Sequence, residues 1–154
     1  MPPNPTPDAV KWITREKIKV DRVACPWLIK RFIDADAEFF FVPAERVLPE
    51  AEKLGASAFD TAGAKLNHRG ELVTFEVILD EYKVRTPALS LLGEIVRAAD
   101  SQPADPHPAG EGLRWIAHGF GQIGLTDHQI LPREFIVYDA LYAECQRRVG
   151  TALA

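Results

Sequence analysis

The stretch D-R-V-A-C-P-W-L-I-K-R-F-I, residues 21–33, combines a helix signal, a free cysteine and several cations. Proline suits the first position of a helix, because its missing N–H would be unpaired there in any case. Apolar residues recur at helical spacing after it. The pattern predicts a helix that begins at Pro26 and places Cys25 at the mouth of that helix.

A helix mouth favours negative charge, because its amide groups are unpaired and the helix dipole adds to their effect. A thiol at such a place tends towards the thiolate, and Arg22 would act in the same direction. Arg22 can also bind two oxygens of an anion at once. We therefore expect a small oxyanion to bind at Arg22 and Cys25. The alternative for Cys25 is a buried apolar role, which is common for free cysteine.

Composition bounds the class of protein. With 154 residues, 47% of them hydrophobic, the chain is long enough for a domain with a core and is not typical of disorder. We expect a flexible, proline-rich tail over residues 1–10, not a signal peptide, and a single domain over residues 11–150. No stretch has the length of a membrane span. Two cysteines give no disulfide framework, so a cytoplasmic location is expected.

Charge is distributed unevenly along the chain. The net charge of −4 argues against a protein that binds nucleic acid directly. Residues 11–31 nevertheless hold seven lysines and arginines against Glu16 and Asp21, a local net charge of +5. A positive field of this kind can steer a small anion to its site. The alternative is a solvated strand and helix face.

The hydrophobic pattern predicts an α+β fold, with short strands and helices in the first half and a mostly helical second half. Strands are expected within residues 11–20, 38–42 and 56–61. Helices are expected over residues 44–54 and 74–84, from Pro87 to about Asp100, within 113–121, and from residue 126 onwards. Thr86 is expected to cap one helix, and Thr126 and Gln129 to form a capping box at another.

One set of residues could bind a metal ion. His68 lies in a turn-rich loop, Glu76 opens the next helix, and Asp100 ends the helix after that. In an antiparallel helix pair, the start of the first helix and the end of the second lie side by side. A histidine with two carboxylates suits divalent Mn, Fe or Zn. The alternatives are structural, since Glu76 would favour the helix dipole and Asp100 could serve a terminal turn. No P-loop, G-x-G-x-x-G, H-E-x-x-H or G-x-S-x-G motif is present, so no nucleotide cofactor is expected.

Several runs carry a likeness to a known family. They are W-I-T-R-E-K-I-K-V-D-R-V-A-C-P-W-L-I-K-R-F-I-D (12–34), A-E-F-F-F-V-P (37–43), H-R-G-E (68–71), I-V-R-A-A-D (95–100) and V-Y-D-A-L-Y (137–142). Together they resemble the C-terminal domain family of the chromate resistance protein ChrB, and the likeness spans nearly the whole chain. The residues that match the pattern include Arg22, Cys25, His68, Glu76, Asp100 and Asp139.

The resemblance implies a part in bacterial chromate resistance, since full-length ChrB is associated with chromate sensing and with regulation of an efflux operon. The sequence resembles only the C-terminal part, so direct DNA binding is not expected. The first hypothesis is a module that binds a metal ion, a small oxyanion such as chromate, or both, in a sensing or response role. The alternative is a metal- or thiol-dependent chromate reductase, for which no electron source is visible. The oligomeric state stays open.

Overall fold

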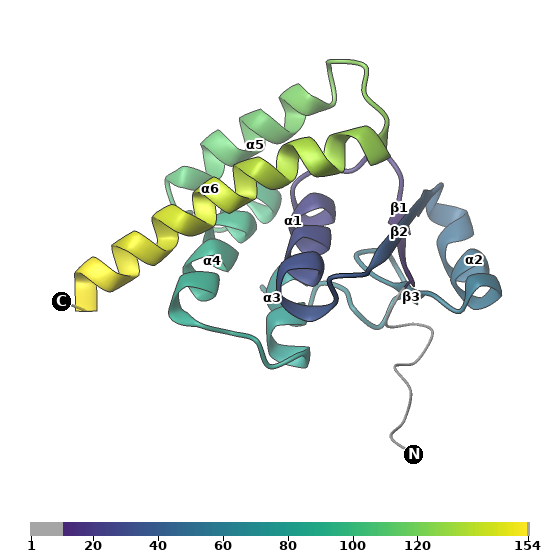
Figure 1. Ribbon diagram of the computed structural model, residues 1–154, viewed down its shortest axis with the longest axis horizontal. Coiled ribbons are helices and arrows are strands. Elements are labelled where there is room, and N and C mark those ends of the chain that lie inside the picture. Colours follow the sequence, from purple (N-terminus) through teal and green to yellow (C-terminus); the bar gives the residue numbers. More distant parts are fainter. Residues whose placement is uncertain (1–10, 154) are drawn as a thin grey trace.

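The computed structural model describes residues 11–153, so the predicted tail over residues 1–10 lies outside the described residues. A small sheet and its helices form the first half, and four helices follow (Figure 1). The elements in chain order are β1 (Lys11–Arg15), α1 (Asp21–Leu28) with a π-helical continuation (Ile29–Ile33), β2 (Glu38–Val42), a 3₁₀ turn (Ala44–Arg46), α2 (Val47–Leu54), β3 (Ser57–Ala58), α3 (Thr74–Glu81), α4 (Pro87–Ser101), α5 (Ala109–Phe120) and α6 (Asp127–Leu153).

The sheet has three parallel strands in the order β2-β1-β3. From β1 the chain passes through α1 to β2 at one edge, and then through α2 back across β1 to β3 at the other edge. Parallel crossovers are right-handed, so two crossovers in opposite directions place their helices on opposite faces. Figure 1 shows this arrangement, with α2 on one side of the sheet and α1 and α3 on the other.

The two faces of β1 bury different cores, because successive side chains of a strand point to opposite sides. Ile13 packs with Val47 and Ala51 beneath α2. Trp12 belongs to the larger core on the opposite face, to which the remaining helices contribute. The long helix α6 packs on α1 and α4, and its buried Tyr138 donates a hydrogen bond of 3.1 Å to the carbonyl of Val20.

The predicted α+β fold is confirmed, with the strands in the first half and helices after them. The strand Glu38–Val42 is confirmed in its bounds. Thr86 accepts the amide hydrogen of Leu89 at 3.2 Å, as expected of a cap. The Thr126 and Gln129 capping box is also formed, with bonds of 2.9 Å and 3.2 Å. These features depend on neighbours in sequence, which is why the pattern identified them.

The predicted helix start at Pro26 is wrong. Helix α1 begins at Asp21 and contains Pro26, so Cys25 lies inside the helix and is fully buried. The turn that starts the helix is made at Val20, which holds a φ of 40° and whose carbonyl accepts the amides of Val23 and Ala24. A positive φ is rare for a β-branched residue. An acidic residue in the first turn also suits the helix dipole.

Two strands are shorter than predicted. The first ends at Arg15 and the third at Ala58, where the pattern had suggested residues 20 and 61. Asp21 and Asp60 therefore lie beyond the carboxyl ends of neighbouring parallel strands. None of the helices within residues 11–153 is long and apolar enough to cross a membrane.

Candidate metal centre

The polar cluster of this protein lies at the carboxyl edge of the sheet, where ligands of open parallel sheets commonly bind. Asp60 follows β3 by two residues, and Asp21 opens α1 after the loop that leaves β1. The pairing of β1 with β3 brings these two aspartates into one place. Asp60 adopts a left-handed backbone, with a φ of 51°, and its side-chain Oδ1 accepts the hydroxyl of Thr74 at 2.8 Å.

Asp21 is a fully buried carboxylate that joins two helices. Its Oδ2 accepts the amide hydrogen of Thr74 at 2.9 Å, and its Oδ1 accepts that of Phe75 at 3.0 Å. These amides open helix α3, so Asp21 satisfies donors that a helix start leaves unpaired. Thr74 is the first residue of this helix and does not cap it by its own side chain, as its place in the pattern had suggested.

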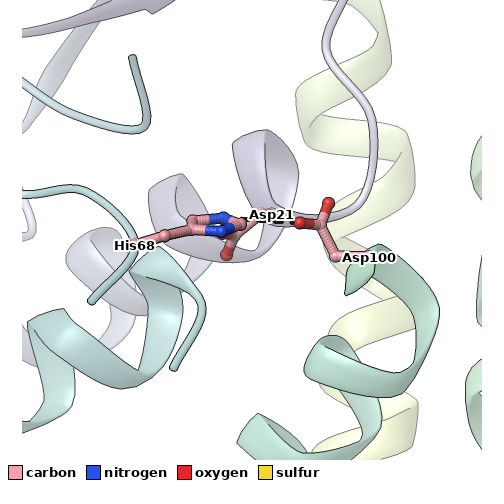
Figure 2. A group of neighbouring side chains, drawn as sticks. All are labelled: Asp21, His68 and Asp100. Carbon is pink, nitrogen blue, oxygen red and sulfur yellow. Dashed lines mark hydrogen bonds and ion pairs between the residues drawn. The ribbon is translucent and has the colours of Figure 1, made fainter. Parts of the chain in front are cut away.

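His68 is the centre of the cluster. Its Nε2 lies 3.2 Å from Oδ2 of Asp21, 3.3 Å from Oδ1 of Asp60 and 3.4 Å from Oδ2 of Asp100. Figure 2 shows Asp21, His68 and Asp100 pointing toward one another from α1, from the loop before α3 and from the end of α4. The predicted proximity of His68 and Asp100 is thus present, while Asp21 and Asp60 complete the group.

The spacing of these atoms suits a shared cation. With metal–ligand bonds of about 2.1 Å, neighbouring ligands lie about 3.0 Å apart in an octahedron and about 3.4 Å apart in a tetrahedron. The three distances from His68 Nε2, 3.2 to 3.4 Å, fall in that interval. One ligand atom from each of Asp21, His68 and Asp100 lies within 4.8 Å of the others. One nitrogen with two or three carboxylate oxygens is a donor set for Mn, Fe or Zn.

The protonation of the cluster reflects its excess of carboxylates. Hydrogen bonds to Asp21 and Asp60 raise the pKa of His68 to about 10. Burial, followed by the charges of Asp21 and Asp60, raises the pKa of Asp100 to about 7. A proton on His68 Nε2 and a metal ion would occupy the same position, and both would offset the same negative charge.

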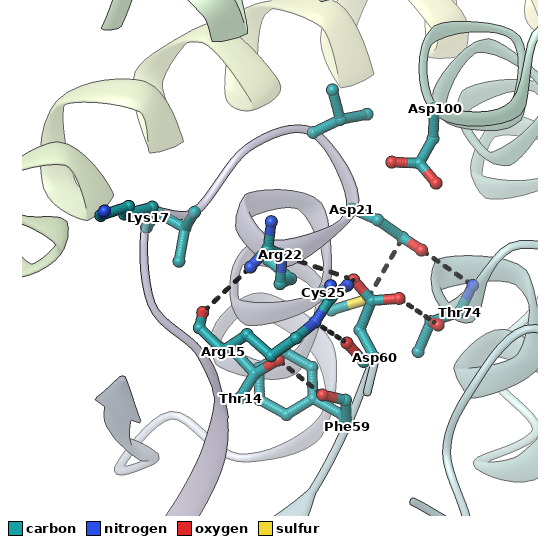
Figure 3. Close-up of polar contacts among 12 residues, drawn as sticks. Thr14, Arg15, Lys17, Asp21, Arg22, Cys25, Phe59, Asp60, Thr74 and Asp100 are labelled. Atoms are coloured by element: carbon teal, nitrogen blue, oxygen red, sulfur yellow. Dashed lines mark hydrogen bonds and ion pairs between the residues drawn. The ribbon is translucent and has the colours of Figure 1, made fainter. Parts of the chain in front are cut away.

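Arg22 lies beside the cluster but serves partly as its frame. Its Nη1 donates to the carbonyls of Arg15 and Glu16 at 3.2 Å and 2.9 Å, and its Nε lies 3.7 Å from Oδ2 of Asp60 (Figure 3). The sequence had suggested Asp21 as the partner that orients Arg22, and Asp60 takes this place.

Cys25 does not lie at a helix mouth, and the amides after it belong to the interior of α1. Its buried thiol lies 3.4 Å from Oδ1 of Asp21 (Figure 3). Burial, followed by the charge of Asp21, raises the pKa of the Cys25 thiol well above its usual value. The basis for a thiolate at Cys25 is therefore wrong, since the helix start lies one turn earlier.

Glu76 stands apart from the other predicted metal ligands. Its carboxylate receives Nε of Arg97 at 3.1 Å and 3.3 Å and the amide hydrogen of Val73 at 3.2 Å. The two helices do pack on each other, but Arg97 of α4 lies opposite Glu76 and binds it. Glu76 is therefore placed as a helix-cap and ion-pair residue, because it has a cation of its own.

A cavity of about 290 Å³ opens above the cluster. Asp60, His68 and Asp100 line its inner part. Positive or potentially positive side chains line the rest, and they are Arg15, Lys19, Arg22, Arg114 and His118. The arrangement can hold a cation on the carboxylates and an anion against the surrounding arginines at the same time.

Sequence reasoning missed Asp21 and Asp60 as members of the cluster. Asp21 was assigned to Arg22, and Asp60 fell inside a predicted strand that in fact ends at Ala58. The usable signal was the position of an acidic residue just beyond each of two short strands, since parallel strands bring their carboxyl ends to one edge.

Comparison with known proteins gives a consistent assignment. The family described as ChrB, C-terminal domain, matches residues 12–145. Protein ChrB of Cupriavidus metallidurans is 34% identical over 133 residues, which covers 86% of this chain and 40% of that protein. This chain therefore spans less than half the length of that relative. No solved structure matches the chain at a significant level.

Proposed function

Because this chain belongs to the family of ChrB C-terminal domains, we propose that it contributes to chromate resistance as a sensing or response module. In this proposal the module holds one divalent metal ion on His68, Asp21 and Asp100, with Asp60 beside them. A small oxyanion such as chromate binds next to the ion, against Arg22. The family supports the association with chromate, and the geometry of the cluster supports the metal.

The observation that carries the metal proposal is the convergence of three carboxylates on one histidine nitrogen, at 3.2 to 3.4 Å. Buried carboxylates need counter-charge. Arg15 and Arg22 lie 3.7 Å from Asp60, while Asp21 faces two amides and His68. A divalent ion would supply the missing positive charge and would turn the inner cavity towards binding an anion.

The oxyanion part of the proposal rests on Arg22 and the positive lining of the cavity. Cys25 contributes no exposed thiol to it. The alternative function, a thiol-dependent chromate reductase, would need a thiolate that reaches substrate, and a buried thiol with a raised pKa does not suit that role. Chromate consumption by metal-loaded protein with NADH or glutathione would instead favour a metal-dependent reductase.

Calorimetric titration of metal-free protein with Mn²⁺, Fe²⁺ and Zn²⁺ tests the metal site. We expect one ion per chain, and an affinity at least about 100-fold lower in His68→Ala, because a direct ligand is lost. His128→Ala is the matched control, since His128 is exposed and stacks on Phe41 away from the cluster. Affinity should fall in acid, because the ion must displace the proton on His68. Full metal affinity in His68→Ala would refute the assignment.

Chromate titration of the metal-loaded protein, with sulfate as competitor, tests the anion site. Arg22→Ala should weaken chromate binding more than Lys30→Ala, since Lys30 is exposed and directed to the carbonyl of Ala35. Arg22→Lys keeps the positive charge and separates loss of charge from loss of the bidentate guanidinium. Equal chromate affinity in wild type and Arg22→Ala would remove Arg22 from the site.

A further inference from the structure

Helix α5 places two side chains on the cavity that the metal proposal does not use. Arg114 and His118 are four residues apart, so they lie one above the other on the same face of the helix. Both line the cavity that His68 and Asp100 also line. Lys19, from the loop after β1, is a third member of this outer side. These three residues, Lys19, Arg114 and His118, are called the α5 side of the cavity.

The α5 side is held firmly against the metal cluster. A Cβ on Gly110 would lie 2.5 Å from the Cβ of Ala98, so α5 approaches α4 more closely than any larger residue would allow. Arg114 follows Gly110 by about one turn, and Asp100 follows Ala98 by two residues on the facing helix. The close contact therefore fixes the position of Arg114 relative to Asp100.

The guanidinium of Arg114 is also oriented before any ligand binds. Its Nε and Nη2 donate to the two carboxylate oxygens of Glu111, at 3.2 Å and 2.5 Å. The side chain of Glu111 is 59% exposed, so it neutralises Arg114 less than a buried partner would. A pre-oriented arginine loses little conformational entropy when it binds an anion. Arg15 and Arg22, by contrast, face Asp60.

The size of the cavity indicates more than one group on the ligand. About 290 Å³ is the share of roughly ten water molecules in the liquid, at about 30 Å³ each. A single tetrahedral oxyanion at the metal position would fill only part of that space. The remainder lies towards a side lined by positive groups, where a second negative group of the same molecule would be stabilised.

We propose that the α5 side is a second anion subsite, and that the natural ligand is a small organic dianion. One oxyanion group binds at the metal position, and a phosphate or carboxylate at the other end binds Arg114 and His118. The metal end of this ligand rests on the proposed function, whereas the α5 side binds its group through residues of its own and is tested without metal.

Phosphonoacetate and inorganic phosphate are suitable probes, because they share a tetrahedral group and only phosphonoacetate carries a second anion. Calorimetry on the full chain at low ionic strength, with and without Mn²⁺, should show phosphonoacetate binding at least tenfold more tightly than phosphate to the metal-loaded protein. Arg114→Gln should remove this preference and should also weaken phosphate binding to the metal-free protein at least about fivefold, because one charge-assisted contact is lost.

Arg148→Gln is the matched control, because Arg148 makes the same kind of exposed ion pair with Glu144 on α6 and does not line the cavity. It should leave both affinities within about twofold, as expected of a distant surface charge. Metal content should be unchanged in Arg114→Gln. Failure to bind metal, together with an effect of Arg114→Gln on phosphate in the metal-free protein, would refute the metal centre and keep the α5 subsite. Equal affinity for both probes in wild type and Arg114→Gln would overturn the inference, whatever the metal result.

Discussion

Buried carboxylates occur in two places that differ in their counter-charge. At the contact of α3 and α4, Glu76 is 3% exposed and is paired with Arg97. At the carboxyl edge of the sheet, Asp21 is fully buried and shares His68 with Asp60 and Asp100. The first place balances one carboxylate with one guanidinium. The second gathers three carboxylates around one imidazole.

This difference separates a structural ion pair from a binding site. A buried carboxylate that has its own arginine gains nothing from a further cation, whereas a cluster with excess negative charge is stabilised by one. The sequence treats Glu76, Asp100 and Asp21 alike as acidic residues near helix ends. Only their partners in space distinguish them, and these partners are the object of the predictions below.

Removal of the Asp21 carboxylate should have the largest effect on stability. Asp21→Ala leaves the amides of Thr74 and Phe75 without their acceptor in a buried place, which should lower the free energy of unfolding by about 3 to 5 kcal/mol. Asp127 is the matched control, since it also accepts two amide hydrogens, from Lys17 and Ile18, but near the surface. Asp127→Ala should cost about 1 kcal/mol. Urea unfolding followed by circular dichroism measures both, and equal losses would show that burial of Asp21 adds nothing.

A third kind of buried acid sharpens the comparison. Glu134 on α6 is fully buried, and neither of its carboxylate oxygens has a hydrogen-bond partner among the described residues. Burial raises its pKa from 4.5 to about 7. Its folded pKa thus lies above its unfolded value, so its contribution to stability is complete below pH 4.5 and is lost as pH rises through 7.

Glu134→Gln should therefore match the wild type at pH 4 and exceed it at pH 8. The difference in the free energy of unfolding at pH 8 should be about 2 to 3 kcal/mol, since each unit of pKa shift corresponds to about 1.4 kcal/mol. Urea unfolding of both proteins at the two pH values gives the comparison. A wild type whose stability stays as high at pH 8 as that of Glu134→Gln would contradict the isolated burial of this carboxylate.

The sequence could predict what neighbours in the chain determine. The bounds of the strand Glu38–Val42 and the caps at Thr86 and Thr126 follow from local patterns, and His68 with Asp100 follows from ligand chemistry and an assumed helix pair. Asp60 could not be placed, because its position depends on the pairing of β1 with β3. The start of α1 was misplaced, because the turn at Val20 requires a φ of 40° that no rule assigns to valine.

The Glu76 ion pair should matter for stability and not for metal binding. Glu76→Gln removes the charge that Arg97 binds, and the side chain of Arg97 is 29% exposed, so water compensates part of the loss. The expected cost is about 1 to 2 kcal/mol in urea unfolding. Metal affinity should stay within about threefold of wild type, because Glu76 is held by Arg97 outside the cluster. A loss as large as that of His68→Ala would return Glu76 to the ligand set.

The smallest effects should come from Cys25, although it touches Asp21. Its thiol is buried and lies 3.4 Å from Oδ1 of Asp21, so it can orient this carboxylate only weakly, because sulfur is a poor donor. Cys25→Ser keeps a donor at the same place and should change metal and chromate affinity by less than about twofold. In the native protein, a thiol reagent such as 5,5′-dithiobis(2-nitrobenzoate) should modify Cys25 at a small fraction of the rate seen in urea, because reaction requires the exposed thiolate. Rapid modification of native protein, blocked by chromate, would place Cys25 at the ligand after all and would restore the thiol to the site.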